Sequence, residues 1–148
     1  MHHRDFAATL RAHGLKATPQ RMALLHALQK AHQPQSVARL KTACARSSMD
    51  TVTLYRALEA FLEAGLVRSV NLNHGHADYE LVVPGDHHHH VICTSCGAIA
   101  DVTLPYERTL ERAALAAARA FASVTDHALE FFGTCSACAK RSEKHARA

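Results

Sequence analysis

Apolar residues in the first part of the chain recur at helical spacing, and start and stop signals divide them into segments. The first segment ends at Gly14, and the second begins at Thr18-Pro19, an N-cap followed by proline at the first helical position. The third follows Pro34 and places Cys44 on its apolar face, where free cysteine packs as a small hydrophobe. We therefore predict three helices here, with Cys44 in the core.

A fourth helix is predicted between an N-cap at Asp50 or Thr51 and a stop at Gly65. Its apolar stripe consists of Leu54, Leu58, Phe61 and Leu62. The stripe leaves the N-terminal end exposed, with Thr51, Val52, Thr53, Tyr55 and Arg56. Such side chains suit base edges and phosphates, as a DNA-recognition helix requires, although a merely solvated helix start would look similar.

Two strand-like runs, residues 66–72 and 77–83, follow this helix and are separated by a glycine-containing loop. Helices closed by a hairpin are typical of a winged helix. We therefore predict an α+β chain with a winged-helix DNA-binding domain at residues 1–83 and a hinge at residues 84–86. A small α/β dimerisation domain with a four-cysteine zinc site is predicted at residues 87–148.

The second domain alternates strands and helices differently from the first. Strands are expected at residues 87–93, around 98–102 and at 124–132, with a helix at about 106–122. The polar, basic tail from Lys140 is expected to fray.

Charge is uneven along the chain. Residues 1–49 carry eight Lys or Arg against one acid, a net of +7, whereas residues 84–148 are balanced. A basic segment is the electrostatic signature of a DNA-binding surface, although a solvated helical surface remains an alternative. The candidate DNA-binding residues are Lys16, Arg21, Thr51, Thr53, Tyr55 and Arg56.

The composition, 48% hydrophobic and 20% charged, is that of a globular protein. No apolar run is long enough for a signal peptide or a membrane span, so we predict a cytoplasmic protein without a membrane partner. Thiols stay reduced in that compartment, where paired cysteines usually indicate metal or redox chemistry.

Four of the five cysteines form two C-x-x-C pairs, Cys93 with Cys96 and Cys135 with Cys138. Two such pairs complete a closed tetrahedral thiolate shell, which indicates a structural rather than a catalytic Zn²⁺. A redox-active C-x-x-C is the alternative, but it usually involves one pair between a strand and a helix.

Four consecutive histidines, His87 to His90, precede the first cysteine pair. Side chains of an extended strand alternate between its faces, so His88 and His90 should lie on one side and His87 and His89 on the other. One strand could thus supply two metal sites, and N/O ligands suit Fe²⁺, Mn²⁺ or Zn²⁺. The alternative is a solvated histidine-rich loop.

An enzyme is disfavoured, because the chain has neither H-E-x-x-H nor H-x-E with P-C-x-x-C, and no small-molecule substrate is expected. A metal buffer or chaperone would explain the histidines but not the basic segment or the recognition helix.

Several motifs together resemble the ferric uptake regulator family in order and spacing. They are Thr18-Pro19-Gln20-Arg21, residues 51–58, Glu63-Ala64-Gly65-Leu66-Val67, residues 87–97, Asp126-His127 and the ending from Gly133 to Cys138. The resemblance spans about residues 5–138. It implies a homodimeric repressor whose metal-loaded form binds double-stranded operator DNA of metal-uptake or peroxide-defence genes.

The resemblance also implies three metal sites. Cys93, Cys96, Cys135 and Cys138 match its structural zinc site, and His32, Glu80, His88, His90 and Asp101 match its regulatory site, which bridges the two domains. His87, His89 and His127, with Glu107 or Glu111, match an additional site.

Two features of the chain bear on the sensed metal. Position 89 is histidine where iron sensors often have aspartate, and four consecutive histidines also occur in some zinc sensors. No cysteine lies between Cys44 and Cys93, however, where zinc sensors often use one. The resemblance therefore favours ferrous iron, with zinc and peroxide sensing as alternatives.

Overall fold

The computed structural model describes residues 5–146, and the chain divides into two compact units, Met1–Asp86 (unit 1) and His87–Ala148 (unit 2). Each unit contains its own three-stranded sheet. The predicted hinge, residues 84–86, lies at the end of unit 1. None of the helices in residues 5–146 is long and apolar enough to cross a membrane.

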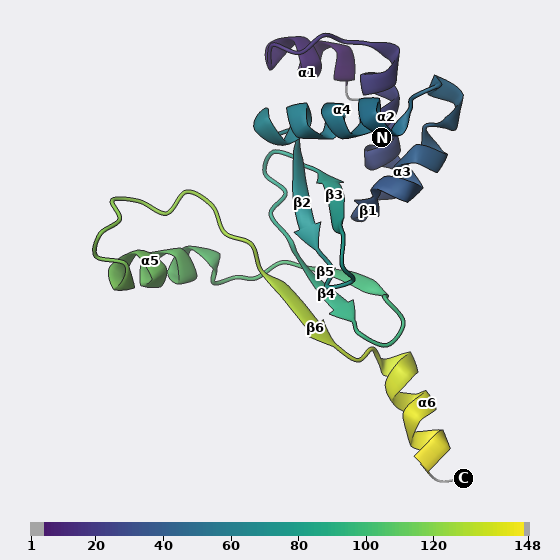
Figure 1. Ribbon diagram of the computed structural model, residues 1–148. Helices are drawn as coiled ribbons and strands as arrows, with labels where there is room; N and C mark the ends of the chain where they lie inside the picture. Colours follow the sequence, from purple (N-terminus) through teal and green to yellow (C-terminus); the bar gives the residue numbers. More distant parts are fainter. Residues whose placement is uncertain (1–4, 147–148) are drawn as a thin grey trace. The chain divides into compact units, whose positions relative to one another are not determined.

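Unit 1 begins with the helices that the hydrophobic pattern predicts, drawn from purple to teal in Figure 1. They are α1 (Phe6–Ala12), α2 (Pro19–Ala31), α3 (Val37–Ala43) and α4 (Thr51–Glu63), with a short 3-10 turn, η1 (Ala45–Ser47). The Thr18 hydroxyl accepts a hydrogen bond from the Arg21 amide, which confirms the predicted N-cap of α2.

The ends of α4 follow from two residues. The Asp50 carboxylate accepts a hydrogen bond from the Thr53 amide at 2.6 Å, so Asp50 rather than Thr51 is the N-cap. Gly65 has φ +65°, a left-handed conformation that disfavours side chains with a Cβ. Leu54, Leu58 and Phe61 are buried as predicted, whereas Leu62 is 37% exposed.

The sheet of unit 1 has the order β1-β3-β2 and is antiparallel throughout. The predicted hairpin consists of β2 (Val67–Asn71) and β3 (Ala77–Leu81). The pattern did not predict β1 (Gln35–Ser36), because two residues are too short for a periodic signal. Ser36 also caps α3 through a hydrogen bond from the Arg39 amide.

The core of unit 1 joins all four helices to the sheet. Its largest completely buried side chains include Phe61, Leu10 and Leu24. Cys44 is only 3% exposed and belongs to this cluster, as predicted. Burial also raises the pKa of its thiol. Leu54 and Phe61 of α4 share this cluster with Val67 and Leu81 of the hairpin, so α4 packs against the hairpin.

Unit 2 is built around β4, which lies between an antiparallel and a parallel neighbour. Its elements are β4 (His89–Cys93), β5 (Ile99–Val102), α5 (Glu107–Ala117), β6 (Glu130–Gly133) and α6 (Ser136–Ala146). In the register, His90 pairs with Asp101 on β5 and with Glu130 on β6. The mixed helix and strand content of the two units confirms the α+β prediction.

Two predicted boundaries in unit 2 were wrong, and so was the expectation of a frayed segment from Lys140 for residues up to 146. Helix α5 ends at Ala117 because Ala118 closes its last turn and Phe121 donates to Ala118 in a separate turn. Strand β6 begins at Glu130, since only this stretch pairs with β4. The region expected to fray forms α6, whose first turns include the buried Cys138.

Candidate metal centres and DNA-binding surface

The four paired cysteines converge in unit 2. Cys93 ends β4, and Cys135 follows β6, which pairs with β4 in parallel, so both knuckles meet at the same end of the sheet. The four Sγ atoms all lie within 4.8 Å of one another. Cys96 Sγ and Cys135 Sγ are 3.7 Å apart. A tetrahedral shell with Zn–S bonds of about 2.3 Å requires about 3.8 Å between sulfurs, so the donor set fits zinc.

Backbone amides support the thiolates that a zinc site needs. The Cys135 amide donates to Cys93 Sγ at 3.2 Å, and this contact, with the amides of Cys96 and Ser95, lowers the pKa of Cys93 to about 6. Burial and the neighbouring thiols raise the pKa of Cys138 to about 11. A bound cation would offset that cost.

The knuckles are also joined by the backbone and by Arg141. The Thr94 amide donates to the Gly133 carbonyl at 2.8 Å, and the Arg141 guanidinium donates to Cys138 Sγ at 2.6 Å. The site therefore links the first strand of unit 2 to its last helix.

The histidine run divides as strand alternation predicts, and His87 and His89 meet His127. Their ligand atoms lie within 4.8 Å of one another. Glu107 Oε1 is 2.9 Å from His87 Nδ1 and 3.3 Å from His89 Nε2. The histidine contacts, first of all that of His87, lower the pKa of Glu107, which favours its carboxylate.

Glu111 occupies a different place in this cluster. Its Oε1 lies 3.1 Å from His127 Nδ1, while His127 Nε2 faces His89 Nε2 at 3.3 Å. Glu111 therefore contacts the nitrogen of His127 that points away from the cluster. This geometry suits a carboxylate that orients a ligand rather than one that binds the metal.

The other two histidines of the run form a separate pair. The ring centroids of His88 and His90 are 5.2 Å apart, and His90 Nε2 lies 3.7 Å from Asp101 Oδ1. The antiparallel register of β4 and β5 places Asp101 directly opposite His90. Three of the five predicted regulatory ligands thus lie together in unit 2.

The remaining two predicted regulatory ligands belong to unit 1. His32 is the C-cap of α2, with φ +51°. Glu80 lies on β3, and its carboxylate binds the Arg68 guanidinium at 3.0 Å. Their part in a regulatory site stays a prediction.

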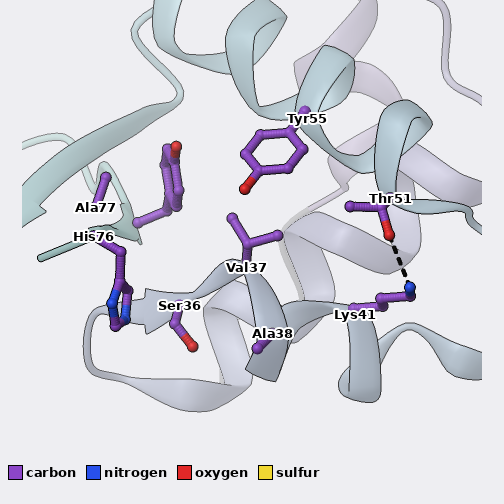
Figure 2. A pocket seen from close by; sticks show the side chains of 9 residues that line it. Ser36, Val37, Ala38, Lys41, Thr51, Tyr55, His76 and Ala77 are labelled. Carbon is purple, nitrogen blue, oxygen red and sulfur yellow. Dashed lines mark hydrogen bonds between the residues drawn. The ribbon is translucent and has the colours of Figure 1, made fainter.

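Four candidate DNA-binding residues lie in the first two turns of α4: Thr51, Thr53, Tyr55 and Arg56. The other two, Lys16 and Arg21, lie just before and at the start of α2. Tyr55 is 46% exposed and Val52 is 59% exposed at the N-terminal end of α4. Thr51 accepts a hydrogen bond from Lys41 Nζ at 2.7 Å (Figure 2). The Arg21 guanidinium donates to the Lys16 carbonyl at 3.2 Å, which brings these two basic residues together.

A surface pocket of about 620 Å³ in unit 1 is lined by residues of α3, α4, β3 and the loop before β3. Figure 2 shows Lys41 and Thr51 on one side, Tyr55 above and His76 on the opposite side. Lys41 and His76 also line this pocket, and neither is among the residues predicted from the sequence. The basic charge of the third helix could have indicated Lys41 as a residue of this surface. The position of His76 could not be predicted, because it depends on the register of the hairpin.

Comparison with known proteins places this fold and these donor clusters in a family. The model of the ferric uptake regulator family matches residues 12–132. The ferric uptake regulation protein of Legionella pneumophila is 35% identical over 128 residues, covering 84% of this chain and 92% of the relative. The peroxide-responsive repressor PerR of Staphylococcus aureus (strain Mu50 / ATCC 700699) is 31% identical over 133 residues, covering 88% and 87%.

Solved structures agree with this result. The crystal structure of the Vibrio cholerae ferric uptake regulator superposes with a TM-score of 0.71 at 27% identity, covering 88% of this chain and 100% of that one. A zinc uptake regulator complexed with zinc and DNA gives a TM-score of 0.67 at 25% identity, covering 93% of each chain. The chain belongs to the ferric uptake regulator family and is a metal-responsive transcriptional regulator.

Proposed function

We propose that this chain is a homodimeric repressor whose regulatory site senses ferrous iron and whose metal-loaded form binds a palindromic DNA operator. The observation that carries the proposal is the His88, His90 and Asp101 group, in which His90 Nε2 lies 3.7 Å from Asp101 Oδ1. Imidazole and carboxylate donors suit an exchangeable divalent ion better than four thiolates do. The predicted contribution of His32 and Glu80 completes the proposed ligand set.

The mechanism that we propose is linkage between metal binding and DNA binding. A metal that binds one arrangement of the protein more tightly than another shifts the population toward the first. In the proposed dimer, that arrangement sets two α4 helices at the spacing of two operator half-sites. The exposed Tyr55 and the Lys41–Thr51 contact support α4 as the helix that meets DNA.

Exposed apolar side chains in unit 2 support the homodimer. Leu110 is 47% exposed, Phe121 67% and Phe132 45%. A folded unit rarely leaves several large apolar side chains in water unless a partner covers them. A second copy of unit 2 is the partner that we propose.

Peroxide sensing and zinc sensing are the two alternative functions within the family. The 31% identity to a peroxide-responsive repressor favours the first, and the similarity to a zinc uptake regulator with zinc and DNA favours the second. Both alternatives involve the same proposed binding to DNA. They differ in the signal that changes metal occupancy, which is peroxide in one case and zinc in the other.

Operator binding measured separately with Fe²⁺, Mn²⁺ and Zn²⁺ tests the proposal, after mild chelation that spares the four-cysteine site. We expect Fe²⁺ to restore binding of the wild-type protein at lower free concentration than the other two metals. His90→Ala should weaken metal-dependent binding by at least tenfold (about 1.4 kcal/mol) and remain a folded dimer by sedimentation. Affinity that is independent of all three metals would overturn the regulatory-site assignment.

A further inference from the structure

The loop between β2 and β3 brings two histidines toward an aspartate on β3. His74 and His76 lie in the loop, and Asp78 is the second residue of the strand. The ligand atoms of all three lie within 4.8 Å of one another. The three residues are in unit 1 and belong to none of the metal sites described above, although His76 also lines the pocket beside α3 and α4.

The two imidazole rings lie against each other, close to the carboxylate. The ring centroids of His74 and His76 are 3.9 Å apart, and His74 Nε2 lies 2.9 Å from Asp78 Oδ2. Gly75, between the histidines, has φ +85° and so lets the chain turn tightly enough to bring both rings to one side. Ligand atoms on a tetrahedral zinc lie about 3.4 Å apart, given bonds of about 2.0–2.1 Å.

The carboxylate is the independent sign that a ligand belongs here. The Asp78 side chain is only 5% exposed, and its Oδ2 has His74 Nε2 at 2.9 Å but no hydrogen bond of good geometry from the described residues. Burial raises the pKa of Asp78, while His74, His76 and Arg39 act in the opposite direction. A buried carboxylate oxygen that faces two imidazoles has the environment of a metal ligand.

The cluster is distinct from the predicted regulatory ligand Glu80 on the same strand. Glu80 pairs in register with Arg68, whereas Asp78 pairs with Val70. Residues two apart on a strand are about 6.6 Å apart along it. Glu80 binds Arg68 at 3.0 Å, while Asp78 faces the loop histidines.

We infer that His74, His76 and Asp78 form a further metal site, which binds a divalent transition cation of the Zn²⁺ class at the tip of the hairpin. Two imidazoles and one carboxylate supply three ligands, and water completes a tetrahedral shell. The ion fixes the loop at residues 73–76 to the central strand. With neutral imidazoles, binding makes the local charge more positive by about two units, beside the pocket that His76 lines.

Zinc stoichiometry of the full chain in the absence of DNA tests this site. Zn²⁺ is titrated against a chromophoric chelator into wild type, the double variant His74→Gln/His76→Gln and the matched control His13→Gln/His26→Gln. The control removes two histidines of unit 1 that belong to no cluster among the described residues. We expect the first variant to bind one zinc per chain fewer than wild type, and the control to bind the same number as wild type.

Two further measurements separate metal binding from a change in folding. His76→Gln replaces an exposed side chain and should weaken binding of the last zinc by at least tenfold, as should Asp78→Asn. Hydrogen exchange at residues 71–77 should slow when wild type binds that zinc, and not in the double variant. Equal stoichiometry in both double variants would overturn the site and leave a His74–Asp78 ion pair only. Because no operator is present, this outcome is independent of the proposed repressor function.

Discussion

The two units are held together by different means. In unit 1, side chains from four helices and the hairpin form one apolar cluster, in which Leu10, Leu54 and Phe61 are fully buried. Among the described residues of unit 2, the buried apolar side chains are Ile92, Cys93 and Cys138, and two of these are metal-ligand candidates. Helix α5 buries none of its residues.

This difference agrees with the proposal that a metal and a partner subunit stabilise unit 2 in place of a large core. A domain of about 60 residues is only marginally stable from its core alone, and small domains often add a disulfide, a metal or an oligomeric interface. The four-cysteine site connects β4 to α6, and the exposed Phe131 and Phe132 offer surface to a second copy. Unit 1 instead has the larger apolar core.

The largest expected effect is the loss of unit 2 on removal of the structural zinc. In Cys96→Ser, or after strong chelation, unit 2 should lose its dispersed NMR signals and become sensitive to proteolysis, because zinc binding supplies its folding free energy. Unit 1 should keep its signals. Retention of native signals from β4 and β6 in zinc-free protein would show that unit 2 folds without zinc.

The reciprocal change affects unit 1 alone. Phe61→Ala removes a fully buried ring and should lower the free energy of unfolding of unit 1 by about 3–5 kcal/mol. Denaturant unfolding followed by circular dichroism measures this, and the zinc content should remain that of wild type. Ser142→Ala in α6 is a surface control and should change the stability of unit 1 very little.

A smaller effect is expected within unit 2, where the loss of either of two carboxylates should weaken metal binding to a different extent. Glu107→Gln should abolish metal binding at the His87, His89 and His127 cluster, because Glu107 Oε1 faces two of its histidines. Glu111→Gln should weaken binding by about 10–100-fold, as loss of a residue that orients a ligand does. Metal titration of both variants measures the difference, and equal losses would show that both residues bind the ion.

The smallest expected effect is a pH dependence in unit 1. Hydrogen bonds from the Thr53 amide lower the pKa of Asp50 in the folded protein. A lowered pKa stabilises the fold above the ordinary aspartate range, and this contribution is lost as pH falls through the folded value. Asp50→Asn keeps a capping side chain but should flatten this acid limb in pH-dependent unfolding, whereas an unchanged limb would assign it to other groups.

Much of unit 1 could be predicted because its signals are local. Thr18-Pro19, Asp50 and Gly65 act on neighbouring backbone groups. Thr18 and Gly65 mark the predicted helix ends, and Asp50 is one of the two N-caps predicted for α4. The pairing of the two cysteine knuckles could also be predicted from the sequence, because C-x-x-C spacing alone brings two thiolates to one ion.

The features that could not be predicted depend on contacts far apart in the sequence. The parallel pairing of β4 with β6 starts at Glu130, and no local residue marks that boundary. The different positions of Glu107 and Glu111 depend on the direction from which His127 approaches. The burial of Asp78 follows from its place on the central strand, between Val70 and Ser36.

The parallel pairing of β4 with β6 has a consequence for synthesis on the ribosome. All core elements of unit 1 have been made once Leu81 is complete, so this unit can fold while the rest is translated. β4 then waits for Glu130–Gly133, and its cysteines wait for Cys135 and Cys138. The nascent chain can therefore fold unit 1 before unit 2 can close, and zinc can complete unit 2 only after Cys138 has been made.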